Sequence, residues 1–92
     1  MSRGYGKIQW RLLAILAAHE RSPASRADRL GRGLDTPTLA LRIHGREPTH
    51  SELVSVRRAL AALTRAGEVR ILMTYERRHY WVRVKARREP PG

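Results

Sequence analysis

The side chains best able to do chemistry in this 92-residue chain are its arginines, of which there are 17, against two lysines and eight acidic residues. A guanidinium presents five N–H donors in a planar fork, so it binds phosphates and the edge of guanine rather than breaking bonds. The formal net charge of +11 at pH 7 predicts a polyanionic partner. A hydrophobic content of 41% still allows a folded core, unlike the composition of a disordered basic tail.

The sequence shows no recognisable arrangement of residues for bond-making chemistry. It contains no cysteine, which excludes disulfides, thiolate metal sites and cysteine nucleophiles, and its four histidines lack metal-site spacing. Paired carboxylates, a glycine-rich phosphate loop and a Ser-His-Asp set are not recognisable either. We therefore expect a protein that is not an enzyme, with no cofactor, no metal and no small-molecule ligand. The apolar runs are too short for a membrane span, so the expected location is cytoplasmic, or nucleoid-associated in a bacterium or archaeon.

Hydrophobic periodicity predicts one domain over residues 1–92 that begins with two helices. Apolar residues three and four positions apart predict a helix over 5–19. Residues 20–34 are a basic connection, which fits either a short helix or a loop, and we slightly favour the short helix. Thr36 as a cap, followed by a proline, predicts a second helix over 36–44 that stops at a glycine.

A longer helix and a hairpin complete the expected elements. Thr49 and Glu52 form a capping-box pattern at the start of a helix over 49–66. The period then changes to two, which predicts a β-hairpin over 69–85, and residues 86–92 have the composition of a flexible tail. In the first strand the alternating residues are Val69, Ile71 and Met73. In the second strand they are Tyr80, Val82 and Val84, and the residues between and after them are Trp81, Arg83 and Lys85.

Two groups of apolar or aromatic residues, one on the first helix and one on the hairpin, each have two interpretations. Trp10, Leu13 and Ala17 form a second apolar stripe on the first helix, which either another segment of the chain covers or a second subunit contacts, and we slightly favour the first. Tyr80 and Trp81 could stack on single-stranded bases, but we expect them to cover the core.

The segments TPTLALRIHG, residues 36–45, and PTHSELVSVRRALAALTRAGEV, residues 48–69, resemble the winged helix-turn-helix family of DNA-binding domains. The resemblance covers Asp35 to about Lys85. It implies an α+β fold in which three to four helices are followed by a C-terminal β-hairpin wing. Thr38, where many relatives have Glu, and the long basic connection are departures from the family pattern.

The resemblance also implies a function, which is sequence-specific binding to double-stranded DNA by a small transcriptional regulator. The helix over 49–66 would read the major groove, and the wing would contact the backbone or the minor groove. A homodimer is a further option. The alternatives are a phage or plasmid DNA-binding accessory protein for excision, replication or partition, an RNA-binding winged helix, and a protein-interaction winged helix whose charge only confers solubility.

A helical wheel of residues 49–66 places small, polar and cationic side chains opposite its apolar stripe. Small side chains let the helix approach the groove floor, and Arg58 can donate two hydrogen bonds to guanine. The N-terminal N–H groups can bind phosphate. The candidate DNA-binding residues are Thr49, His50, Ser51, Val54, Ser55, Arg57, Arg58 and Arg65 on this helix, Arg77 and Arg78 at the wing tip, and Arg42, Arg46 and Lys7 as phosphate contacts.

Overall fold

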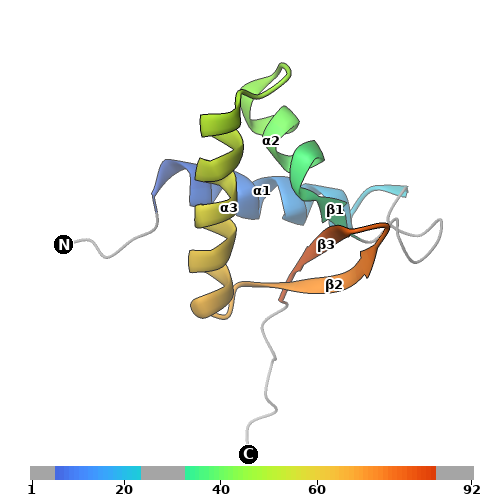
Figure 1. Ribbon diagram of the computed structural model, residues 1–92. Helices are drawn as coiled ribbons and strands as arrows, with labels where there is room; N and C mark the ends of the chain where they lie inside the picture. The colour runs from blue at the N-terminus through green and yellow to red at the C-terminus, as the bar shows by residue number, and fades with distance from the viewer. Residues whose placement is uncertain (1–5, 24–32, 85–92) are drawn as a thin grey trace, which may run out of the picture.

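The computed structural model describes residues 6–23 and 33–84, which form an α+β fold with three helices and a three-stranded antiparallel sheet (Figure 1). The strand order in the sheet is β1-β3-β2. In chain order the elements are α1 (Lys7–Glu20), β1 (Leu34–Asp35), α2 (Thr36–His44), α3 (His50–Arg65), β2 (Val69–Tyr75) and β3 (Arg78–Arg83).

One hydrophobic core joins the three helices to the sheet. In Figure 1, α1 crosses behind α3, α2 lies beside the upper half of α3, and the β2–β3 hairpin lies below α2. Because each helix contributes one apolar face to the core, the opposite face of α3 is left in solvent. The buried residues of the core are Leu12, Leu16, Leu34, Leu39, Ala40, Ile43, Val56, Ala59, Leu60, Leu63, Val69 and Trp81.

The ends of α2 follow local sequence signals, with one correction to the sequence prediction. The N-cap is Asp35 and not Thr36, since Asp35 Oδ1 accepts a hydrogen bond from the Thr38 N–H at 3.2 Å. A carboxylate is at least as good a cap as a hydroxyl, and the Thr36 hydroxyl has another partner, the Trp81 indole. At the other end Gly45 has φ of 71°, a left-handed conformation that ends the helix as predicted.

The capping box at the start of α3 is confirmed. The Glu52 N–H donates to Thr49 Oγ1 at 3.2 Å, and the Thr49 N–H donates to Glu52 Oε1 at 2.9 Å. These reciprocal bonds satisfy two N–H groups that have no partner within the helix. The helix ends at Arg65, two residues before Gly67, which has φ of 80°.

The sheet contains one strand more than the predicted hairpin. Leu34 and Asp35 form β1, which pairs with Trp81 and Tyr80 of β3, although the sequence assigns residue 34 to a basic connection. A strand of two residues is too short to show an alternating pattern. Only its pairing with a distant strand defines it, so the sequence could not predict it. The sheet therefore includes the two residues directly before α2, and β1 attaches the β3 edge of the hairpin to the start of that helix.

The hairpin itself departs from the predicted alternation. A β-bulge lies between Ile71 and Met73, so the two sides of β2 exchange there. On β3, Trp81 is the buried residue, as expected for a residue that covers the core, whereas Tyr80 and Val82 are half-buried. The apolar pattern predicts both strands, but β3 ends at Arg83, so Val84 lies outside it, and Lys85 falls outside the described residues. The pattern also does not indicate which face of β3 meets the helices.

Some predictions fall outside the described residues. The short helix proposed within 20–34 falls mainly on residues 24–32, and the tail over 86–92 and residue 5 of the first helix are also outside. Within the described ranges, the first helix runs from Lys7 to Glu20, two residues later than the predicted start and one later than the predicted end.

Candidate nucleic-acid interface

The solvent face of α3 gathers most of the predicted contact residues. Three guanidinium groups on this helix, those of Arg57, Arg58 and Arg65, have no hydrogen bond or ion pair among the described residues. Val54 is half-buried and lies at the edge of this face. The remaining predicted residues of the helix, Thr49, His50, Ser51 and Ser55, are exposed.

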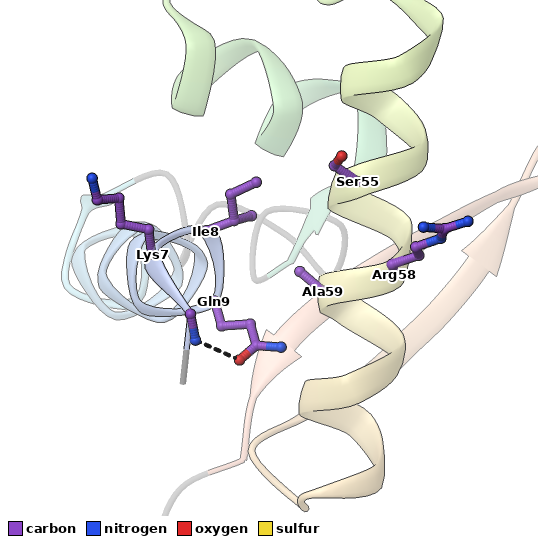
Figure 2. A pocket seen from close by; sticks show the side chains of 7 residues that line it. Lys7, Ile8, Gln9, Ser55, Arg58 and Ala59 are labelled. Carbon is purple, nitrogen blue, oxygen red and sulfur yellow. Dashed lines mark hydrogen bonds between the residues drawn. The ribbon is translucent and has the colours of Figure 1, made fainter. Parts of the chain in front are cut away.

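An open depression extends this face onto α1. It has a volume of about 440 Å³, and Ile8 of α1 and Ala59 of α3 supply apolar lining. Figure 2 shows Lys7 and Arg58 at its opposite borders, with Ser55 above Arg58 on α3. Lys7 and Arg58 thus line the same depression, although Lys7 lies 51 residues before Arg58 in the sequence.

The N-terminus of α1 borders the same depression. The Gly6 N–H donates to the Gln9 side-chain oxygen at 2.9 Å, so this N–H is already satisfied (Figure 2). Lys7 is exposed and has no hydrogen bond or ion pair among the described residues. The positive charge on this side of the molecule therefore comes from two helices.

Arg46 differs from the α3 arginines because its charge is already paired. Its guanidinium donates two hydrogen bonds to the Glu52 carboxylate, at 2.9 and 2.7 Å. The hydrogen bond from Arg46, followed by that from the Thr49 N–H, lowers the pKa of Glu52 to about 2. The pair fixes the turn between α2 and α3, which leaves Arg46 less available to an external phosphate than an unpaired arginine.

The two arginines predicted at the wing tip have different environments. Glu76 and Arg77 are the two turn residues of the hairpin, since Tyr75 pairs with Arg78. Arg77 is exposed and has no partner among the described residues. Arg78 is the first residue of β3, and its Nη1 donates to Asp35 Oδ2 at 3.1 Å.

Arg42 and the stripe on α1 complete the predicted set. Arg42 is exposed on the last turn of α2, with no partner among the described residues. Trp10 is 57% exposed, but Leu13 packs against the core and Ala17 is half-buried. The stripe is therefore divided, and Trp10 is its exposed part.

Three long-range contacts of arginine were not anticipated from the sequence. Arg78 pairs with Asp35, the Arg83 guanidinium donates to the Glu20 carboxylate at 3.3 and 3.4 Å, and Arg11 donates to the Ile43 carbonyl at 3.1 Å. The cap role of Asp35 has a local signal, because an aspartate three residues before a free N–H at a helix start is a cap pattern. The three long-range contacts have no local sequence signal, because their partners are between 32 and 63 positions apart in the chain.

Within residues 6–23 and 33–84, no group of three or more His, Asp or Glu side chains is arranged to hold a metal ion. No helix in the same ranges is long and apolar enough to span a membrane.

Comparisons with known proteins assign no family. No family model matches the sequence, and no curated protein or solved structure gives a significant match.

Proposed function

We propose that this chain is a winged helix-turn-helix domain that binds double-stranded DNA in a sequence-specific manner and acts as a small transcriptional regulator. The order α1-β1-α2-α3-β2-β3 supports this proposal, with α2 and α3 as the helix-turn-helix and the β2–β3 hairpin as the wing. The turn between the helices spans residues 45–49. In such domains the second helix of the motif enters the major groove.

The observation that carries the proposal is the unpaired positive charge of α3. Arg57, Arg58 and Arg65 face solvent without partners among the described residues. The acidic residue of the same helix, Glu52, is paired with Arg46. An approaching phosphate backbone therefore meets cations on this helix, and the cost of separating an existing ion pair does not arise for the three arginines.

The shape of α3 fits the same role. A helix of 16 residues is about 24 Å long, and a single helix fits the major groove, which is about 12 Å wide. Ser51 and Ser55 are short enough to let the backbone approach the bases. Lys7, across the depression from Arg58, would reach a phosphate at the groove edge.

The wing adds a contact on the flanking DNA. Arg77 lies at the tip of the hairpin, where an arginine gains from the negative potential of a minor groove or the backbone. In this proposal Arg58 contributes to sequence readout, whereas Lys7 and Arg77 contribute affinity that depends little on sequence.

Arg58→Ala is the test of this function. Preferred sites are first selected from a pool of random duplexes, and binding to a selected site and to a scrambled duplex is then measured at the same salt concentration. We expect the substitution to weaken binding to the selected site about tenfold or more, and binding to the scrambled duplex much less, because a bidentate contact to guanine is lost. Genomic sites in front of genes would support the regulatory role.

Two results would contradict the proposal. Absence of binding to any duplex at low salt would favour a protein-interaction module. Stronger competition by structured RNA than by selected duplex DNA would favour an RNA-binding domain. Arg21→Ala is the matched control, since it removes the same charge at the far end of α1.

A further inference from the structure

Three contacts hold β3 against the start of α2. The backbone of β3 pairs with β1, the two residues directly before α2. Arg78 Nη1 donates to Asp35 Oδ2 at 3.1 Å, and the Trp81 indole N–H donates to Thr36 Oγ1 at 3.1 Å. Since α2 and α3 share the core, these contacts connect the hairpin to α3 through α2.

Asp35 is the centre of this connection. Its side chain is 7% exposed, and its two carboxylate oxygens have different partners. Oδ1 accepts from the Thr38 N–H at the start of α2, and Oδ2 accepts from Arg78 on β3. A carboxylate this buried is costly without a cationic partner, so the wing is held where Arg78 can reach it.

The position of Arg78 determines that of Arg77. The two residues are adjacent, and Arg77 belongs to a two-residue turn that allows little independent movement. Arg77 therefore presents its charge from a backbone position that is set by β3. If β3 moves away from α2, the position of Arg77 relative to Arg58 on α3 is less restricted, because the contacts that then remain are mainly those of β2 with α3 and of β3 with α1.

We propose that Asp35 and Arg78 are a positioning pair that fixes the wing relative to α3, and that Arg78 serves DNA binding through this pair and not by contacting DNA. The inference rests on the proposed function. In this inference Arg77 contacts DNA at the wing tip, and Arg78 positions Arg77 through its ion pair with Asp35. Preorganisation of this kind raises affinity because the two DNA contacts are held together before binding.

Asp35→Asn gives a test in which the sign of the effect is decisive. Asparagine caps a helix about as well as aspartate, so the bond to the Thr38 N–H is retained while the ion pair with Arg78 is lost. Removing a negative charge from a DNA-binding protein ordinarily strengthens binding, by about two- to threefold. The positioning pair predicts the opposite, a loss of about fivefold, since apparent affinity falls with the fraction of molecules in the competent arrangement.

Glu76→Gln is the matched control. Glu76 lies in the turn of the same hairpin, and its carboxylate has no partner among the described residues. The control removes one negative charge from the wing without removing an ion pair, so we expect binding to strengthen. If Asp35→Asn strengthens binding as Glu76→Gln does, the positioning role is wrong.

A measurement without DNA separates this inference from the proposed function. Hydrogen exchange of the Trp81 indole N–H, followed by NMR, reports on the contact with Thr36, and the Trp10 indole on α1 is an internal reference. We expect Trp81 exchange to rise about fivefold in Asp35→Asn and in Arg78→Gln, with no change in Glu76→Gln.

The outcomes distinguish the two claims. Unchanged Trp81 exchange in both Asp35→Asn and Arg78→Gln overturns the positioning pair, even where the wild-type protein binds DNA. A wild-type protein that binds no duplex overturns the proposed function, whatever the exchange data show. A folded Arg78→Gln variant also gives an independent result if Asp35→Asn does not fold.

Discussion

Replacing Arg57, Arg58 and Arg65 together with alanine removes half of the unpaired basic side chains of the candidate interface. The six such side chains are Lys7, Arg42, Arg57, Arg58, Arg65 and Arg77. If each neutralises one phosphate, log affinity falls against log salt with a slope of about −5 for the wild-type protein and about −3 for the triple variant. Alanine is the best helix former, so α3 is expected to persist.

The difference in slope becomes large over an accessible salt range. Between about 50 and about 200 mM salt, the wild-type protein should lose on the order of a thousandfold in affinity and the triple variant about fortyfold. Fluorescence anisotropy of a labelled duplex, titrated at four or five salt concentrations, measures both slopes. Circular dichroism of each variant confirms that α3 is retained.

A pair of single substitutions tests whether position matters as well as charge. Arg58→Ala and Arg21→Ala each reduce the net charge by one, but Arg21 caps the C-terminus of α1, about 20 Å along the helix from Lys7. We expect Arg58→Ala to make the slope shallower by about 0.9 and Arg21→Ala to leave it nearly unchanged. Equal slopes for the triple variant and the wild-type protein would refute the assignment of α3 to the interface. Equal effects of the two single substitutions would show that only net charge matters.

Three further predictions concern stability and the hairpin turn. Because the pKa of Glu52 is about 2 in the folded protein, below its ordinary value of 4.5, the stability that it contributes is present above about pH 4.5 and is lost as the pH falls towards 2. Thermal unfolding of Glu52→Gln should therefore depend less on pH in that window, and an unchanged dependence would contradict the role of the Arg46 bridge. Leu60→Ala, at a side chain that is 1% exposed, should lower the free energy of unfolding by about 2–5 kcal/mol in urea denaturation, and a loss below 1 kcal/mol would contradict its place in the core. Arg77→Gly should raise the free energy of unfolding by about 0.5–1 kcal/mol, because φ is 66° there, while it weakens DNA binding; a lower unfolding temperature would count against strain at the turn.

The sequence predicts those parts of the fold that depend on near neighbours in the chain. The caps of α3 need only Thr49 and Glu52, three residues apart, and the end of α2 needs only Gly45. Helix faces are equally local, since residues three and four apart share a side, and Val56, Leu60 and Leu63 are buried together on one side of α3.

The parts that sequence analysis missed depend on contacts between distant segments. β1 exists through its pairing with β3, more than 40 residues later. The bulge after Ile71 exchanges the faces of β2, which an alternating pattern cannot indicate. The pairing of Arg78 with Asp35 is not visible either, because an arginine next to a turn has the same local sequence whether it faces solvent or a buried carboxylate.

The acidic residues, rather than the arginines, determine how the net charge of +11 is distributed over this molecule. Glu20, Asp35 and Glu52 each pair with one arginine, which is Arg83, Arg78 and Arg46 respectively. The pairs of Glu20 and Asp35 join segments that are far apart in the chain, and the pair of Glu52 bridges the turn between α2 and α3, so the charge in these pairs stabilises the arrangement of the elements. The arginines of α3 and the turn residue Arg77 lie beyond the reach of these carboxylates and keep their charge available. A high arginine content alone therefore predicts affinity for polyanions, whereas the positions of a few carboxylates determine which arginines keep their charge available for the proposed recognition of DNA.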